Sequence, residues 1–291
     1  MKLPAGFFVL SIWISSSVFA QKDYEIRLNR PLKAGDQCRF SIVGKNYQEM
    51  QADADGQVLM HTRDDFSVEY AGVRKVLEVE PAGRPTKVSD NIEKLLLIRS
   101  GRRTELAKPG AVIVASIQGK KKIFQVDGQA VDAESAKALE LVVDISQGGP
   151  TDDDIFGTKS RKRPGETWDM NGVLAVRDLA RRSNVDARNL SGKVAFESVT
   201  QDENGEILNI KCQVAGDAKP VELPALVTSF HGPFKATLFA KYPVDVSLSC
   251  PEGLLDMSFL FEGSGQTRTG APIHVTGEML RSVTYKLLVL K

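Results

Sequence analysis

Hydrophobic and polar residues alternate one by one over much of the 291-residue chain. The clearest runs lie at 38–42, 66–70, 208–214 and 244–250. A period of two places apolar side chains on one face of an extended segment and polar side chains on the other. We therefore predict a β-strand at each of these runs.

Turn pairs separate the extended segments and indicate hairpins. They are Asp55-Gly56, Ser100-Gly101, Asp127-Gly128 and Asn204-Gly205. Asp-Gly and Asn-Gly readily adopt the positive φ angles of tight hairpin turns. The same signals predict further strands at 104–117 (broken at Pro109-Gly110), 120–126 and 129–131, and a hairpin that joins 193–200 to 206–214.

The stretch 89–99 permits two interpretations. Ser89 or Asp90 would cap a helix, whereas Leu95 and Leu97 before Ser100-Gly101 form one arm of a hairpin. A short apolar run cannot be assigned by its period alone, and we favour the strand.

Two segments carry a helical pattern behind a capping residue. Asp132 precedes 133–145, and Asn171 precedes 173–182. Each segment has one apolar side, as expected of a helix that packs on a sheet. The predicted fold class is therefore mainly β, with antiparallel sheets or an incomplete barrel and two or three short helices.

One opening occurs twice in the chain and predicts two related halves. Residues 30–42 read RPLKAGDQCRFSI and residues 161–172 read RKRPGETWDMNG, each with glycine and an acid before a large side chain. The stretch 146–165 is rich in Gly, Pro, Ser and charge, which favours a boundary. We expect halves at 21–150 and 151–291, forming either one integrated domain or two, with Trp168 as a core anchor.

The N-terminus has the pattern of a secretory signal. Lys2 precedes an apolar run at about 7–14, and Val18-Phe19-Ala20 fits a cleavage site. The run is shorter than the roughly 20 residues of a membrane-spanning helix. We expect cleavage after Ala20, a mature chain that begins at Gln21, and a periplasmic or extracellular protein with no transmembrane segment.

Charge and cysteine content narrow the function classes. The chain has 38 basic and 37 acidic residues, and this balance argues against a nucleic-acid binder. Cys38, Cys212 and Cys250 all lie on the apolar phase of an alternating run. They are either three buried thiols or, in an oxidising compartment, a Cys212–Cys250 disulfide and one free thiol.

Catalytic motifs are missing from the sequence. The histidines His61, His231 and His274 do not have the spacing of helical metal ligands, and no nucleophile elbow or phosphate loop occurs. We predict no catalytic residue, metal site or cofactor. A cryptic hydrolase would need an acid or a serine beside one of these histidines, because triads are defined by geometry.

The stretch 226–244 is rich in aromatic residues. It forms either two core strands around a turn at His231-Gly232-Pro233 or an apolar rim over a cavity or partner site. In the second interpretation the helices at 133–145 and 173–182 act as lids on an incomplete barrel. The predicted ligand-binding residues are then Phe230, Phe234 and Phe239, with Arg177, Arg181 and Arg182 for an anionic head group.

These motifs together resemble those of an uncharacterised family of exported, β-rich bacterial proteins. The resemblance is carried by the two Gly-acid openings, the Val-rich arms with acidic turns at 73–88 and 192–210, and the Asp127-Gly128 hairpin before a helix. The family has no established activity, so the resemblance implies no catalytic or ligand residue. At the level of fold alone, the pattern is similar to periplasmic lipoprotein carriers, in which helices close a half-open β-barrel.

Three functions follow from these expectations. The first is an exported, non-enzymatic protein of the cell envelope or exterior that binds a lipid, another apolar ligand or an envelope protein. The second is a structural or interaction module without a ligand. The third is the cryptic hydrolase. A cavity lined by apolar strand faces would favour the first, and a filled core would favour the second.

Overall fold

The computed structural model describes residues 22–119, 121–182, 185–220 and 227–290. The predicted signal peptide, residues 1–20, lies outside these ranges. The prediction of a mainly β protein is confirmed, because an open antiparallel sheet of 13 strands dominates the described part of the chain. Three helices accompany the sheet within the same residues. None of them is long and apolar enough to cross a membrane.

The strands follow one another almost in chain order across the sheet. Those of the first half are β1 (Gln37–Ala54), β2 (Gln57–Val79), β3 (Pro85–Arg99), β4 (Arg102–Ala107), β5 (Val112–Gln118), β6 (Lys121–Val126) and β7 (Gln129–Ala130). Those of the second half are β8 (Thr167–Asp169), β9 (Val185–Asp202), β10 (Gly205–Pro220), β11 (Val227–Pro243), β12 (Glu252–Gln266) and β13 (Pro272–Val289).

The last strand joins the two halves into one sheet. The order is β7-β6-β5-β3-β2-β1-β13-β12-β11-β10-β9-β8, and β4 pairs with β3. β13 pairs with β1 along 16 registered positions, from Cys38 opposite Val289 to Asp53 opposite His274. The sheet ends at β7 and β8, which have two and three residues. Such short edge strands offer little backbone for pairing with another chain.

The predicted hairpin turns are present. Asp55, Ser100 and Asp127 have φ angles of 52°, 49° and 49°, and each is followed by a glycine at positive φ. Consecutive positive φ angles match the right-handed twist of the two strands that such a turn connects. The strand interpretation of 89–99 is also confirmed, because these residues belong to β3.

The two Gly-acid openings form turns with the same hydrogen bond. The Gly35 amide donates to the carbonyl of Val76 in β2 at 2.8 Å, and the Gly165 amide donates to Phe196 in β9 at 2.6 Å. Their φ angles are 97° and 89°, which favours glycine at both positions. Each turn leads into a strand, β1 or β8. The wider relationship between the two halves stays a prediction.

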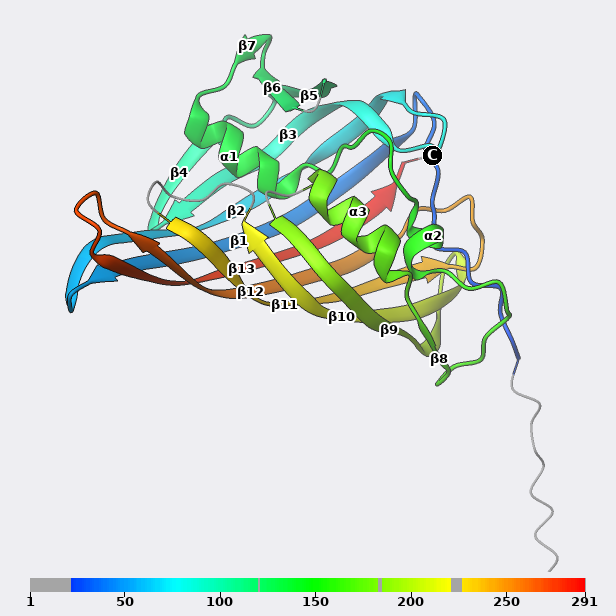
Figure 1. Ribbon diagram of the computed structural model, residues 1–291. Helices are drawn as coiled ribbons and strands as arrows, with labels where there is room; N and C mark the ends of the chain where they lie inside the picture. The colour runs from blue at the N-terminus through cyan, green and yellow to red at the C-terminus, as the bar shows by residue number, and fades with distance from the viewer. Residues whose placement is uncertain (1–21, 120, 183–184, 221–226, 291) are drawn as a thin grey trace, which may run out of the picture.

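The helices lie on one side of the curved sheet, here called the inner face (Figure 1). α1 (Ala133–Val142) begins at Asp132, whose side chain accepts from the Ser135 amide at 2.8 Å. α2 is Asp152–Phe156 and α3 is Gly172–Arg182. A Cβ added at Gly44 of β1 would lie 2.7 Å from Leu141, so α1 packs directly on the backbone of the sheet.

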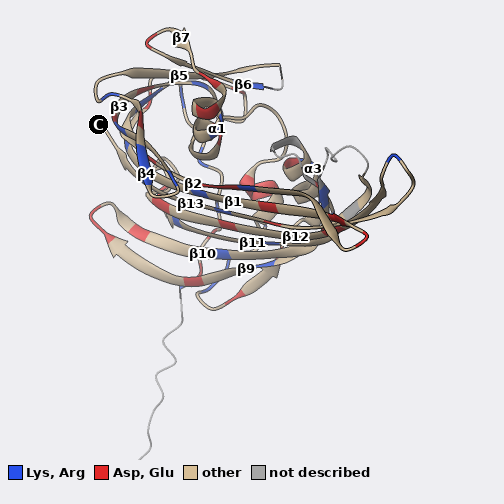
Figure 2. Cartoon of the chain, turned by 90° about the vertical axis from the view of Figure 1, so that its left-hand side faces the viewer, with Lys and Arg blue, Asp and Glu red and all other residues tan. Residues whose placement is uncertain are grey.

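Two apolar cores fill most of the inner face. The first core joins α1 to β1, β2, β3, β5 and β6, which curl around the helix (Figure 2). The second core joins α2, α3 and the segment Tyr24–Leu28 to the inner faces of β9 to β13. Trp168 belongs to the second core, with 8% of its surface exposed, and its indole donates to the Phe156 carbonyl at 2.7 Å. The prediction that Trp168 anchors the core is confirmed.

Two local predictions are wrong. Residues 244–250 form turns rather than a strand, because the Asp245 side chain accepts from the amide and hydroxyl of Ser247 and competes with strand pairing. Residues 227–243 form one strand with no turn at Gly232, which lies against the Leu260 carbonyl of β12.

The position of α2 was not predicted from the sequence. The acid run Asp152-Asp153-Asp154 lies in the stretch 146–165, which the sequence assigned to a boundary. Instead, Thr151 and Asp154 form a capping box around the helix start, with the Thr151 amide donating to Asp154 at 2.8 Å. Carboxylates in the first turn are favourable at the positive end of the helix dipole.

Candidate functional site

The inner face is only partly covered between the two cores. Leu238 of β11 lies opposite Leu255 of β12, Leu255 lies opposite Val283 of β13, and Val283 lies opposite Gly44. Directly opposed residues share one face of a sheet, so this row faces the helices as Gly44 does. We define the central strip as the partly buried inner-face residues Leu238, Leu255, Met257, Met279, Arg281 and Val283.

Methionines surround one end of the central strip. Met50, Met60, Met257 and Met279 are all partly buried and pack against the second core. They come from four adjacent strands, β2, β1, β13 and β12. Methionine is unbranched and polarizable, and it adapts to irregular apolar surfaces. This part of the inner face can therefore change shape more readily than the fully buried cores.

Polar side chains mark the boundary between the cores. The Asp64 carboxylate accepts from Arg99 and Lys137, both at 2.6 Å, and more weakly from the amide of Asn46 at 3.4 Å. Burial would raise the pKa of Asp64, but the hydrogen bonds from Lys137 and Arg99 hold that pKa below its usual value. Asp64 is therefore an ionised carboxylate whose charge is already compensated.

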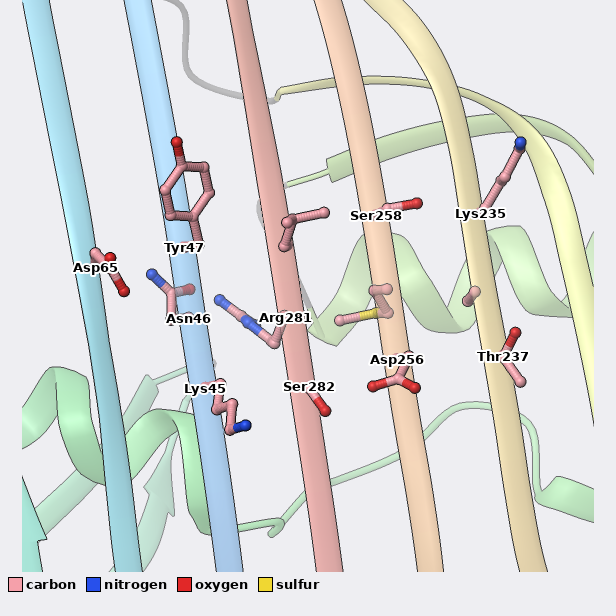
Figure 3. A pocket seen from close by; sticks show the side chains of 13 residues that line it. Lys45, Asn46, Tyr47, Asp65, Lys235, Thr237, Asp256, Ser258, Arg281 and Ser282 are labelled. Carbon is pink, nitrogen blue, oxygen red and sulfur yellow. The ribbon is translucent and has the colours of Figure 1, made fainter. Parts of the chain in front are cut away.

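Arg281 differs from the other cations near the strip. It lies opposite Asn46 and Met257, and Figure 3 shows its side chain reaching toward Asn46. Its Nε atom is buried and has no hydrogen-bond partner in the described part of the chain. Burial lowers the pKa of Arg281, and the only opposing influence resolved is the charge of Glu140 on α1. Arg281 is thus a partly buried guanidinium with no bonded carboxylate among the described residues.

Two tyrosines lie farther along the inner face. Tyr285 of β13 covers Gly253, where an added Cβ would lie 2.5 Å from the ring, and Arg30 lies 5.5 Å from the ring centre of Tyr242. Cys250 precedes β12 nearby, and burial raises the pKa of its thiol to about 12. A thiol with this pKa is protonated at neutral pH, which makes it a poor nucleophile.

The outer face carries an open groove behind the central strip. Figure 3 shows it with the helices behind the strands. Its volume is about 560 Å³, and Asn46, Met257 and Arg281 are among the residues that line it. The side chains along it are mixed in charge and include Lys45, Tyr47, Asp65, Lys235, Asp256 and Leu280. No single ligand chemistry follows from such a mixed lining.

The predicted ligand residues are spread over different parts of the fold. Phe234 is 3% exposed within the second core, and Phe239 lies on the outer face, partly buried. Arg177 is exposed on α3. The side chains of Phe230, Arg181 and Arg182 lie outside the described set. The binding role of these six residues stays a prediction.

Sequence reasoning missed Arg281, although a signal was present. The apolar phase of β13 reads Ile273, Val275, Gly277, Met279, Arg281 and Val283. A charged residue at one of these alternate positions lies on the buried face of the strand, where an ionised group lowers the stability of the folded protein. Such a residue is a candidate for a functional role.

Among the described cysteines and histidines, only His61 has a carboxylate within hydrogen-bond distance: its ring lies 2.7 Å from Glu49, with both side chains exposed on the outer face. Cys38, Cys212 and Cys250 are free thiols in the structure. His274 lies on the outer face, opposite both Asp53 and Ser264, but no hydrogen bond joins the three side chains in the described structure. Within the described residues, no group of three or more His, Cys, Asp or Glu side chains could hold a metal ion.

Comparisons with known proteins identify no family. No family model matches the chain, and no curated protein matches it. Among solved structures, an outer membrane channel from Pseudomonas putida F1 is 9% identical, with alignment over 91% of this chain and 100% of that chain. The TM-score is 0.18, so the resemblance is weak and carries no argument about function.

Proposed function

We propose that this protein is an exported, non-enzymatic protein of the cell envelope or exterior that binds an apolar, lipid-like ligand on the central strip. The observation that carries the proposal is the row of partly buried apolar side chains between two helix-covered cores. The open, curved sheet with helices over its concave side also fits the analogy with lipoprotein carriers. The uncharacterised exported family remains the expected relative.

The energetics favour an apolar ligand on this surface. Each Å² of apolar surface removed from water contributes roughly 25 cal/mol, or about 0.8 kcal/mol for each buried CH₂ group. Leu238, Leu255 and Val283 offer such a surface, and Met257 and Met279 can adapt to the contour of a flexible chain. Burial of an acyl chain on the strip would offset part of the cost of ordering that chain.

A pair of adjacent residues tests the binding surface. Met279 faces inward, whereas Leu280 is 39% exposed on the outer face. We expect Met279→Gln to weaken binding of a fluorescent fatty acid at least 10-fold, because a polar amide replaces an apolar contact. Leu280→Gln is the matched control and should bind as the unmutated protein does. Circular dichroism would verify that both variants fold.

Ligand recovery tests the proposal independently. Native mass spectrometry and lipid extraction of protein purified from its own host should recover an apolar molecule. If no such molecule is recovered, and the fluorescent fatty acid does not bind at micromolar concentration, the proposal is wrong. The interaction module would then be the better interpretation, and the outer groove of about 560 Å³ would be its first candidate surface.

Export has its own test. We propose that the chain is cleaved between Ala20 and Gln21 and is released to the periplasm or exterior. N-terminal sequencing or mass spectrometry of the exported material should find a chain that begins at Gln21, with or without cyclisation to pyroglutamate. A full-length chain that stays in the cytosol would contradict the localisation.

A further inference from the structure

We infer that Arg281 binds the anionic head group, a carboxylate or phosphate, of the ligand on the central strip. This inference rests on the proposed function and names the ligand class, an amphiphile with one apolar chain and a negative head. It differs from the sequence-based expectation, which assigned the head group to Arg177, Arg181 and Arg182 on α3.

The position of Arg281 places one positive charge within an apolar surface. Along the inner face of β13, Met279 precedes it and Val283 follows it. Across the sheet, its neighbours are Met257 of β12 and Asn46 of β1. An apolar chain on the strip would therefore have a cation beside it and a side-chain amide close to that cation. Guanidinium and amide groups are both donors, which suits an anionic oxygen.

The other buried or half-buried arginines on the inner face each donate through at least one nitrogen, although the Nε atoms of Arg30 and Arg99 also lack a partner. Arg74 makes two hydrogen bonds to Asp90, and Arg99 donates to Asp64 at 2.6 Å. Arg30 donates to the Pro243 carbonyl at 2.7 Å. Within the described residues, Arg281 donates no such hydrogen bond, and its Nε atom is shielded from water. Its donors are thus free for a ligand that enters the strip.

Arg281 is partly buried, and its Nε donor has no partner among the described residues, which destabilises the protein unless something compensates it. Donors that lose water and gain no partner cost free energy, and a buried charge costs more than a neutral group. The carboxylate of Glu140 on α1 attracts Arg281 electrostatically, but no hydrogen bond joins the two side chains among the described contacts. A bound carboxylate or phosphate would supply the hydrogen bonds directly, in the bidentate geometry that arginine favours.

Paired probes separate the head group from the chain. A fluorescent fatty acid and the alcohol of the same chain length share the apolar part and differ in charge. We expect Arg281→Met to weaken binding of the acid at least 10-fold and to leave binding of the alcohol within 2-fold. Arg281→Lys should retain part of the preference for the acid. A lysophospholipid serves as a third probe, so that a carboxylate and a phosphate head can be compared.

Arg268→Met is the matched control, because Arg268 is exposed in the turn between β12 and β13, outside the central strip. It should leave binding of all three probes unchanged. Thermal unfolding should show that Arg281→Met is as stable as the unmutated protein or more stable, since it replaces an unpaired buried charge by a side chain of similar length.

Each outcome decides one of the two proposals. If neither the acid nor the alcohol binds to the unmutated protein, the proposed function is wrong. If both bind and Arg281→Met changes neither affinity, the apolar site stands and the inference about Arg281 is wrong. If Arg281→Met and Glu140→Gln both lower the melting temperature, and the preference for the acid persists, Arg281 is a structural partner of α1 and not a ligand anchor.

Discussion

The guanidinium of Arg74 makes two hydrogen bonds to the carboxylate of Asp90, at 2.8 and 2.7 Å. The hydroxyl of Tyr70 donates to the same carboxylate at 2.5 Å, and Asp90 is 0% exposed. All three residues lie in the first half of the sheet, on β2 and β3. Desolvation opposes a buried charge, but the attraction of Asp90 holds the pKa of Arg74 above its usual value. Arg74, Asp90 and Tyr70 therefore form a buried network in which both charged groups have hydrogen-bond partners. Arg281 has no such partner among the described residues.

Removal of one member of this network should destabilise the protein strongly. We expect Asp90→Ala to cost about 3–5 kcal/mol, because it leaves a buried guanidinium unpaired. Urea unfolding followed by circular dichroism would measure the change. The control is Asp65→Ala at the exposed Arg63–Asp65 pair, for which we expect no more than about 1 kcal/mol. Equal effects of the two variants would contradict the buried network.

Trp168 should contribute to stability through burial and one hydrogen bond. We expect Trp168→Ala to cost about 3–5 kcal/mol, as for other large core side chains. Trp168→Phe keeps much of the apolar contact and removes the donor to Phe156, so about 1–3 kcal/mol is expected. Chemical denaturation would measure the free energy of unfolding of both variants and show whether Trp168→Ala loses more than Trp168→Phe. A change within about 0.5 kcal/mol for Trp168→Ala would place the side chain at the surface instead.

Acid should weaken the contact between α1 and the sheet at Asp64. The pKa of Asp64 is lower in the folded chain than in the unfolded chain, so its ion pairs stabilise the protein above the unfolded value of about 3.9. This contribution is lost as pH falls through the lower, folded pKa. We expect Asp64→Asn to be less stable than the unmutated protein at pH 7. The variant should also lose less stability than the unmutated protein on acidification. Urea unfolding of the variant and of the unmutated protein at pH 7 and pH 3 would show whether their free energies of unfolding converge at the lower pH.

The thiols should react slowly in the folded protein. Burial raises the pKa of Cys212 and of Cys250 to about 12, so little thiolate exists at pH 8. We expect slow alkylation of both in the native state and rapid alkylation in denaturant. Thiol titration of oxidised, unfolded protein tests the predicted Cys212–Cys250 bridge as well. Three titratable thiols would exclude the bridge, and one would support it, with roughly 3–4 kcal/mol of stabilisation in the chain-entropy model.

Local signals in the sequence were sufficient for many elements of the fold. Asp55-Gly56 and Asp127-Gly128 predicted their hairpins, because positive φ angles are a property of those residues themselves. Asp132 predicted the start of α1 because a capping bond spans only three residues. The same local reasoning missed the capping box at Thr151, because the stretch 146–165 was assigned to a boundary. It also predicted a strand at 244–250, where the Asp245 side chain instead accepts a hydrogen bond from the Ser247 hydroxyl within a turn.

The sequence by itself determined that the protein is mainly β, where most strands turn, and which faces of those strands are apolar. Only the tertiary structure decided that β13 pairs with β1, that α1 and α3 cover the same face, and that a strip between them stays partly exposed. Arg281 shows the difference. Its place on the apolar phase of β13 can be read from the sequence, but its missing partner cannot. Hydrogen-bond partners on a sheet come from strands and helices distant in the chain, and their identity depends on registers that no local pattern encodes.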